Sequence, residues 1–374
     1  MTDRSREAVA RLLAPAGVAI GGGRAWDIQV HDDRLYARLL SGGSLALGES
    51  YVDGWWDCAA LDELTRRILE AGLERRVPGL RSVLWLALKA RLTNRQAKRR
   101  AYNIGRRHYD LGNDLFQAML DKRMNYSCAY WKDAGGLDQA QEAKLELCCR
   151  KLGLEPGLSV LDIGCGWGAF AKYAAERHGV RVTGITVSSE QAALGRELCE
   201  GLPVRIELQD YRGLSGRYDR VLSVGMIEHV GYKNYRTYME IVDRVLADDG
   251  LFLLQTIGSN LSGRNGEPWM DKYIFPDGML PGPARLTRAA EGLFVLEDWH
   301  NFGPDYDRTL MAWKSNFDAR WEGLSRNGGY DERFRRMWTY YLLTCAGSFR
   351  ARRNQLWQLV FSKRGVRGGY RSPR

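Results

Sequence analysis

The sequence lacks long hydrophobic runs. Its longest apolar stretches, at residues 83–88 and 251–254, fall far short of the roughly 18 residues that a membrane-spanning helix needs. The N-terminal residues also match a secretion signal poorly, because Asp3 and Glu7 accompany the basic residues and Pro15 interrupts the apolar stretch that follows. These absences predict a cytoplasmic protein without a transmembrane anchor.

Metal-ligand and disulfide patterns are also missing. The seven cysteines include no C-x-x-C pair, and the five histidines form no H-x-x-x-H spacing. We therefore expect reduced, mostly buried thiols and no metal site. With 374 residues, of which 45% are hydrophobic and 27% charged, the composition is that of an ordinary globular protein with two or three domains.

Positive charge is abundant but unevenly placed. The net charge is +10, and residues 89–108 and 349–374 each contain eight Lys or Arg and no acidic residue. Leu80, Leu84 and Leu88 recur at helical spacing just before the first basic segment, which is typical of an interfacial amphipathic helix. The alternative is a helix that packs its leucines on the protein's own core. Such segments attract polyanions, which are either nucleic acid or a membrane surface with anionic headgroups. We expect the second: peripheral binding to an anionic phospholipid surface at the inner membrane face, weakened by salt, and no nucleic acid.

The chain divides by its patterns into two domains and a linker. Residues 27–56, with apolar groups broken by turn signals, predict short strands, and a helix at 61–73 follows with Asp62 placed to cap its first turn. We assign residues 1–90 to a small α+β, lipid-engaging domain, 91–105 to a basic linker and 106–374 to a catalytic domain.

From residue 159 apolar strands alternate with helices, which predicts an α/β fold with a doubly wound, Rossmann-like parallel sheet. The expected strands and helices are as follows: strands at 159–163, 180–186, 204–208, 220–224 and 251–256; helices at 169–177, 190–199 and 235–246.

A glycine-rich turn follows the first of these strands. Asp162 precedes Gly164, Gly166 and Gly168, glycines that permit positive φ and close approach of a ligand to the backbone. This run resembles the first motif of S-adenosylmethionine-dependent methyltransferases. The candidate residues for the ribose and adenine of such a donor follow the next two strands: Thr186, Gln191, Asp210 and Tyr211.

Further segments carry a resemblance to a family. Residues 108–131, 224–231, 273–276 and 302–313, together with the glycine motif, are similar to those of bacterial cyclopropane-fatty-acyl-phospholipid synthases, and the resemblance extends over essentially the whole chain. It implies methylene addition across a cis double bond of a phospholipid acyl chain, with S-adenosylmethionine as donor. It also implies that Tyr126 and Ser127 touch the donor.

In that family a bound bicarbonate serves as the base. The resemblance implies that the residues that bind it here are Cys128, Glu228, Ile257 through its backbone amide, and Tyr306. Gln255 stands where the family has a histidine. Glutamine cannot carry a charge or relay a proton as imidazole does. We therefore expect weaker bicarbonate binding or altered activity, or failed ring closure that leaves a methylated or methylenated chain.

Other functions stay open from the sequence. Plant amine N-methyltransferases such as those acting on coclaurine share the Glu-His segment, although a small amine needs no basic membrane patch. A nucleic-acid-binding module would use the basic segments on phosphates. A non-catalytic lipid-binding protein is the third alternative, because of Gln255. We also expect a homodimer, since two linked membrane contacts add avidity.

Overall fold

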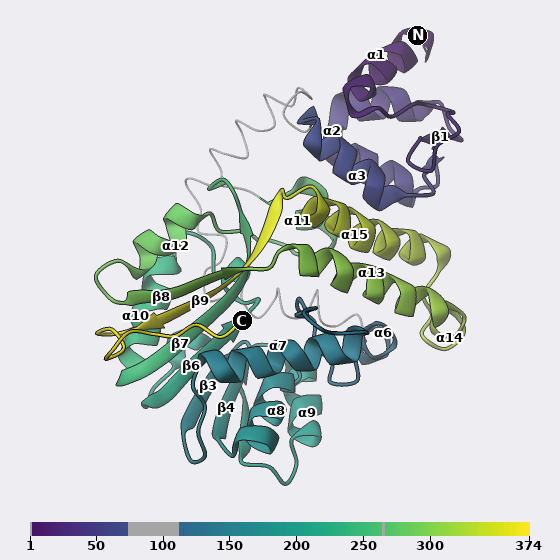
Figure 1. The fold of residues 1–374 in the computed structure, drawn as a ribbon. Coiled ribbons are helices and arrows are strands. Elements are labelled where there is room, and N and C mark those ends of the chain that lie inside the picture. The colour runs from purple at the N-terminus through teal and green to yellow at the C-terminus, as the bar shows by residue number, and fades with distance from the viewer. Residues whose placement is uncertain (1, 74–111, 264–265) are drawn as a thin grey trace. The chain divides into compact units, whose positions relative to one another are not determined.

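The computed structural model describes residues 2–73, 112–263 and 266–374 (Figure 1). The predicted amphipathic helix, the basic segment 89–108 and the predicted linker 91–105 lie outside the described residues. None of the helices that are described is long and apolar enough to cross a membrane.

Two compact units make up the described chain. The first combines residues 2–73 with 266–276 and 306–354, and the second consists of 112–263, 277–305 and 355–374.

A seven-stranded sheet forms the centre of the second unit, with strand order β5-β4-β3-β6-β7-β9-β8. The pairs formed among strands β3 to β7 are all parallel, whereas β8 pairs antiparallel with β9. This confirms the predicted doubly wound α/β sheet. The strands are β3 (Ser159–Ile163), β4 (Arg181–Thr186), β5 (Val204–Leu208), β6 (Tyr218–Val224), β7 (Leu246–Ser259), β8 (Val295–Asn301) and β9 (Asn354–Ser362).

Helices cover both faces of this sheet. Successive strand residues bury on opposite faces, as Val160 and Leu161 do on β3. One face packs on α7, α8 and α9, and the other on α10 and α12. The helices of this unit are α6 (Asn113–Met119), α7 (Leu137–Lys151), α8 (Ala169–His178), α9 (Ser189–Leu198), α10 (Tyr235–Val245) and α12 (Pro283–Ala290).

The first unit is mainly helical and is assembled from distant parts of the sequence. A Cβ at Gly48 on α2 would lie 2.4 Å from Trp269 Cδ1 on α11, so only glycine allows this close packing. Its strands β1 (Gln29–Val30) and β2 (Trp56–Asp57) form one short antiparallel pair. Its helices are α1 (Thr2–Leu13), α2 (Arg34–Val52), α3 (Leu61–Glu70), α11 (Pro268–Tyr273), α13 (Pro304–Ala319), α14 (Trp321–Asn327) and α15 (Glu332–Arg350).

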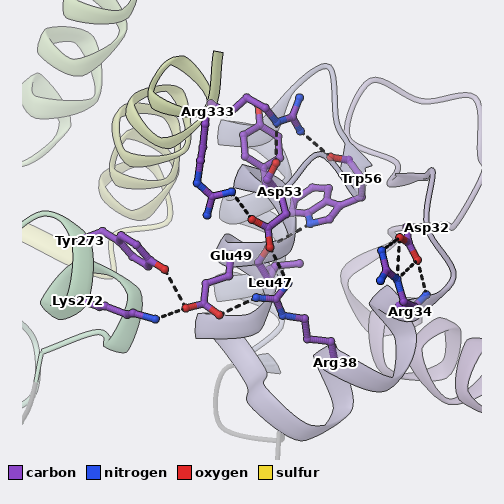
Figure 2. A network of polar contacts seen from close by, with 12 residues as sticks. Asp32, Arg34, Arg38, Leu47, Glu49, Asp53, Trp56, Lys272, Tyr273 and Arg333 are labelled. Atoms are coloured by element: carbon purple, nitrogen blue, oxygen red, sulfur yellow. Dashed lines mark hydrogen bonds and ion pairs between the residues drawn. The ribbon is translucent and has the colours of Figure 1, made fainter. Parts of the chain in front are cut away.

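Polar contacts join the three segments of this unit. Figure 2 shows Glu49 of α2 accepting hydrogen bonds from Arg38 at 2.8 Å and from the Tyr273 hydroxyl of α11 at 2.9 Å. Asp53 accepts from Arg38 at 2.8 Å and from Arg333 of α15. Glu49 of α2 and Asp53, the residue that caps its C-terminal end, therefore hold both later segments.

Two predictions for the N-terminal region were wrong. Residues 35–40 do not form a strand but lie in α2, where Leu35, Tyr36 and Leu39 bury one helical face. The helix continues across a kink at Gly43, which sequence analysis interpreted as a turn. Asp62 does not cap α3; its carboxylate instead accepts a hydrogen bond from Arg350 at 2.6 Å.

Some cations of the C-terminal basic segment are paired with carboxylates and are therefore less available to bind an anionic surface than the composition suggests. Arg350 is paired with Asp307 as well as Asp62, and Arg374 forms two hydrogen bonds to Asp298, at 2.6 and 2.8 Å. The exposed cations of this segment include Arg364, Arg367 and Arg371.

Candidate active site

The glycine-rich turn lies at the carboxyl end of β3 and leads into α8. Gly164, Gly166 and Gly168 have φ of +87°, +56° and +84°, in the region that side chains with a Cβ rarely adopt. A Cβ at Gly164 would also lie 2.9 Å from Met226 Cβ. The amides of Gly164 and Cys165 both donate to the Ile185 carbonyl at 2.9 Å, which ties the turn to β4.

Asp162 lies beside this turn and is almost fully buried, with 2% of its surface exposed. Burial raises the pKa of its carboxyl to about 7, and the nearby positive charge of Lys144 opposes that rise. When ionised, this carboxylate favours a cationic group in the cavity that it lines.

A loop between α6 and α7 supplies another wall. Gln141 of α7 donates to the Ser127 carbonyl at 2.8 Å, and Lys144 donates to Asn125 Oδ1 at 2.9 Å and to Ser127 Oγ at 3.1 Å. Met124 in this loop has a φ of +61°, a strained value for a residue with a side chain. These contacts from α7 hold the strained loop in place.

Thr186 and Gln191 meet at the end of β4. The Thr186 hydroxyl donates to Gln191 Oε1 at 2.9 Å, so the Gln191 amide nitrogen keeps its donors for another partner. After β5, the Asp210 carboxylate accepts from the Arg212 backbone at 2.9 Å and from its guanidinium at 3.0 Å, and Tyr211 is buried against Tyr238.

One cavity joins most of the predicted donor residues. Nine of the ten line it: Tyr126, Ser127, Asp162, Gly164, Gly166, Thr186, Gln191, Asp210 and Tyr211. The tenth, Gly168, is instead the left-handed N-cap residue of α8. A mixed wall of buried carboxylate, amide, hydroxyl and aromatic groups fits a nucleoside that carries a charged amino-acid chain.

Sequence analysis missed several residues of this cavity. Asn125, Lys144 and Arg212 line it as well. Gln141 and Lys144 lie one turn apart on α7. Two polar residues on an otherwise apolar helical face were the sequence pattern that could have identified Lys144. His229 also lines the cavity, and desolvation lowers its pKa to about 4.

A second polar corner follows β6. Glu228 lies in the turn Ile227–His229, and its Oε1 accepts a hydrogen bond from the Ile257 amide of β7 at 2.8 Å. Its Oε2 is buried and has no hydrogen-bond partner among the residues that the structure describes. Burial raises the Glu228 pKa to about 7, against the lowering effects of the backbone amides of Glu228 and Ile257 and of the Thr256 side chain. Because His229 lines the cavity, this corner adjoins it.

The other predicted base-site residues have separate surroundings. Gln255 Oε1 accepts from Gln358 Nε2 of β9 at 2.9 Å, so Gln255 is directed to a neighbouring strand. Cys128 is fully buried, and its thiol donates to the Ala129 carbonyl at 3.2 Å. Tyr306 belongs to the first unit, where it packs on Phe349. Of the predicted base-site residues, Glu228 and Ile257 are joined directly in the described part of the chain.

Comparison with known families gives a consistent result. Residues 96–359 match the model of a family described as mycolic acid cyclopropane synthetase. The chain is 55% identical over 364 residues to the cyclopropane-fatty-acyl-phospholipid synthase of Escherichia coli strain K12, covering 97% of this chain and 94% of the relative.

Two further proteins are similar over large parts of the chain. The tuberculostearic acid methyltransferase UfaA1 of Mycobacterium tuberculosis is 34% identical, with 95% of this chain and 88% of the relative covered. A crystal structure of the mycolic acid cyclopropane synthase CmaA1, complexed with SAH and CTAB, is 32% identical and superposes with a TM-score of 0.64 over 70% of this chain and 98% of that chain.

Proposed function

Because the chain belongs to the mycolic acid cyclopropane synthetase family, we propose that it is a cyclopropane-fatty-acyl-phospholipid synthase with S-adenosylmethionine as its donor. The observation that carries this proposal is the pair of buried carboxylates beside one cavity: Asp162 in its wall and Glu228 in the adjoining corner. The first suits a cationic donor, and the second suits a site where charge develops during the reaction.

The chemistry sets what the protein must do. An alkene is a weak nucleophile, so the sulfonium donor supplies the electrophilic methyl group and the protein holds the methyl and the double bond in line. Methyl transfer leaves a carbocation on the acyl chain, and a proton must leave the new methyl group for the ring to close. The buried corner excludes water, which would otherwise quench that cation.

Glu228 has the properties that a base site needs. Its unpartnered Oε2 is an acceptor that fits the O–H of a bicarbonate ion, and its negative charge stabilises a nearby carbocation. Bicarbonate, when bound, supplies the proton acceptor. Ile257 holds the other oxygen of Glu228, and we propose that Cys128 and Tyr306 complete the set.

We propose that Gln255 determines whether the product is a cyclopropane or a methylated or methylenated acyl chain. Its side-chain oxygen is engaged by Gln358, and it cannot relay a proton. The 34% identity to a tuberculostearic acid methyltransferase favours, as second candidate, a methylated or methylenated acyl chain.

Mass spectrometry of acyl chains tests the function. The protein is incubated with S-adenosylmethionine, bicarbonate and vesicles of a monounsaturated anionic phospholipid, with Gln255→His in parallel. A gain of one CH2 with loss of the alkene is the expected result. A methyl-branched or methylenated product favours the second candidate, and no product from either protein would contradict both.

We further propose that the protein binds an anionic phospholipid surface peripherally as a homodimer. Support comes from the net charge of +10 and from exposed cations such as Arg364, Arg367 and Arg371. Vesicle binding should weaken as ionic strength rises. Salt-independent binding would contradict the electrostatic account, and sedimentation of only monomer at micromolar concentration would contradict the dimer.

A further inference from the structure

Lys144 is a cation in an unusual place. Its side chain lines the cavity and is only 3% exposed, although lysine is almost never fully buried without a purpose or a partner. Its ammonium donates to Asn125 Oδ1 at 2.9 Å and to Ser127 Oγ at 3.1 Å, both neutral oxygens. Neutral acceptors alone offset poorly the cost of burying a charge.

The charges that face Lys144 come from three elements. Asp162 of β3 and Asp121 of the loop after α6 raise its pKa, as do the thiols of Cys128 and Cys148, while desolvation is the larger effect and lowers it. Asp121 is already bonded by the Asn125 amide at 2.8 Å, the Asn125 side chain at 2.9 Å and the Arg123 amide at 3.0 Å. Asp162, by contrast, has Lys144 as the one charge that lowers its pKa among the residues that the structure describes.

The position of Lys144 in the cavity indicates which part of the donor it serves. Thr186, Gln191 and Asp210 follow β4 and β5, the strand ends suited to the nucleoside, whereas Asp162, Ser127 and Lys144 line the same cavity from β3, the loop after α6 and α7. A Ser127 oxygen that accepts from Lys144 has its own proton left to donate. A carboxylate and a hydroxyl donor together match the ammonium and carboxylate of an amino acid.

We propose that Lys144 is a positioning residue for the amino-acid end of the methyl donor: its buried ammonium orients the Ser127 hydroxyl and is the counter-charge of the Asp162 carboxylate in the same cavity. This inference rests on the proposed function for the identity of the donor. Lys144 itself acts through Ser127 and Asp162 and takes no part in methyl transfer.

Donor binding as a function of pH tests the inference. Calorimetric titration with S-adenosylhomocysteine between pH 5.5 and 9 compares the full-length protein with Lys144→Met. Removing the cation raises the pKa of Asp162 above about 7, so more of it is protonated at pH 7 and attracts an ammonium less. A rise of roughly one pKa unit lowers the ionised fraction at pH 7 from about one half to about one tenth, so we expect affinity to fall about fivefold and to recover as pH rises.

Lys151 provides the matched control. It is a second fully buried lysine on α7, but it pairs with Asp298 at 3.0 Å and does not line the cavity. Lys151→Met should change thermal stability and leave the pH profile of binding unchanged. A profile that moves equally in both variants would overturn the proposal, because burial of any lysine on this helix would then explain it.

A double variant tests whether a folding defect of Lys144→Met explains its effect on binding. Asp162→Asn combined with Lys144→Met removes both buried charges, a change that proteins often tolerate. In the Asp162→Asn background, adding Lys144→Met should no longer shift the pH profile. A persistent shift, or an affinity loss in Lys144→Met that is equal at every pH, would overturn the inference. Absence of binding by the unaltered protein would instead reject the proposed function itself.

Discussion

Two carboxylates at neighbouring strand ends have similar pKa values for different reasons. Asp162 lies at the end of β3 and Glu228 in the turn after β6, and burial raises both pKa values to about 7. At Asp162, the positive charge of Lys144 offsets part of the free-energy cost of burying an ionised carboxylate. At Glu228, the Ile257 amide donates a hydrogen bond to the carboxylate.

The difference in surroundings indicates a difference in role. A carboxylate with a fixed counter-charge in a cavity wall is suited to binding, because the counter-charge lowers the cost of ionising it. A carboxylate with one unpartnered buried oxygen is suited to a group that brings its own proton or develops positive charge. We therefore propose donor binding for Asp162 and the later proton chemistry for Glu228.

The largest expected effect is on turnover at Glu228. Glu228→Gln keeps the shape and an oxygen for the Ile257 amide but removes the negative charge. We expect turnover to fall by roughly 100-fold or more, as for loss of a group in acid–base chemistry, while the Kd of S-adenosylhomocysteine changes by less than about threefold. Acyl-chain mass spectrometry and calorimetry measure the two quantities. Retained turnover would remove Glu228 from the chemistry.

The sheet was predictable from the sequence because its signals are local. Alternating apolar strands and helices from residue 159, with a glycine turn after the first strand, specify both the parallel sheet and the edge where a ligand binds. The predicted 159–163 strand coincides with β3. The same logic located Asp162 at the end of an apolar strand, whereas Glu228 was predicted only from the family resemblance.

The helical unit and the buried lysine were not predictable in this way. The packing of Gly48 on Trp269 joins residues far apart in the chain, and no local pattern encodes such a contact. Lys144 belongs to a helix whose other charged residues include exposed ones, so only tertiary structure shows that it is buried. Leu35 and Leu39 have helical spacing, but the following glycines suggested turns.

A second prediction concerns donor affinity at Asp162. Asp162→Asn removes the charge that we assign to the donor ammonium, so the Kd of S-adenosylhomocysteine should rise roughly 10- to 100-fold, the usual range for a charged hydrogen bond. Turnover at saturating donor should fall less than in Glu228→Gln. If Asp162→Asn reduced turnover at saturation without weakening binding, the assignment of roles to the two carboxylates would be reversed.

The smallest expected effect is on thermal stability. Because it is measured without ligand, it reports the buried carboxylates alone. An acid whose pKa is near 7 in the folded protein and near 4 when unfolded binds more protons in the folded state between those values. Stability contributed by such a group is therefore lost as pH rises from about 4 to 7. Asp162→Asn and Glu228→Gln should each unfold several degrees higher than the unaltered protein at pH 8, and the difference should be much smaller at pH 5, where most of that stability is still present. Scanning calorimetry without ligand measures this, and a variant that is less stable at pH 8 would show that its carboxylate is stabilised by its partners when ionised.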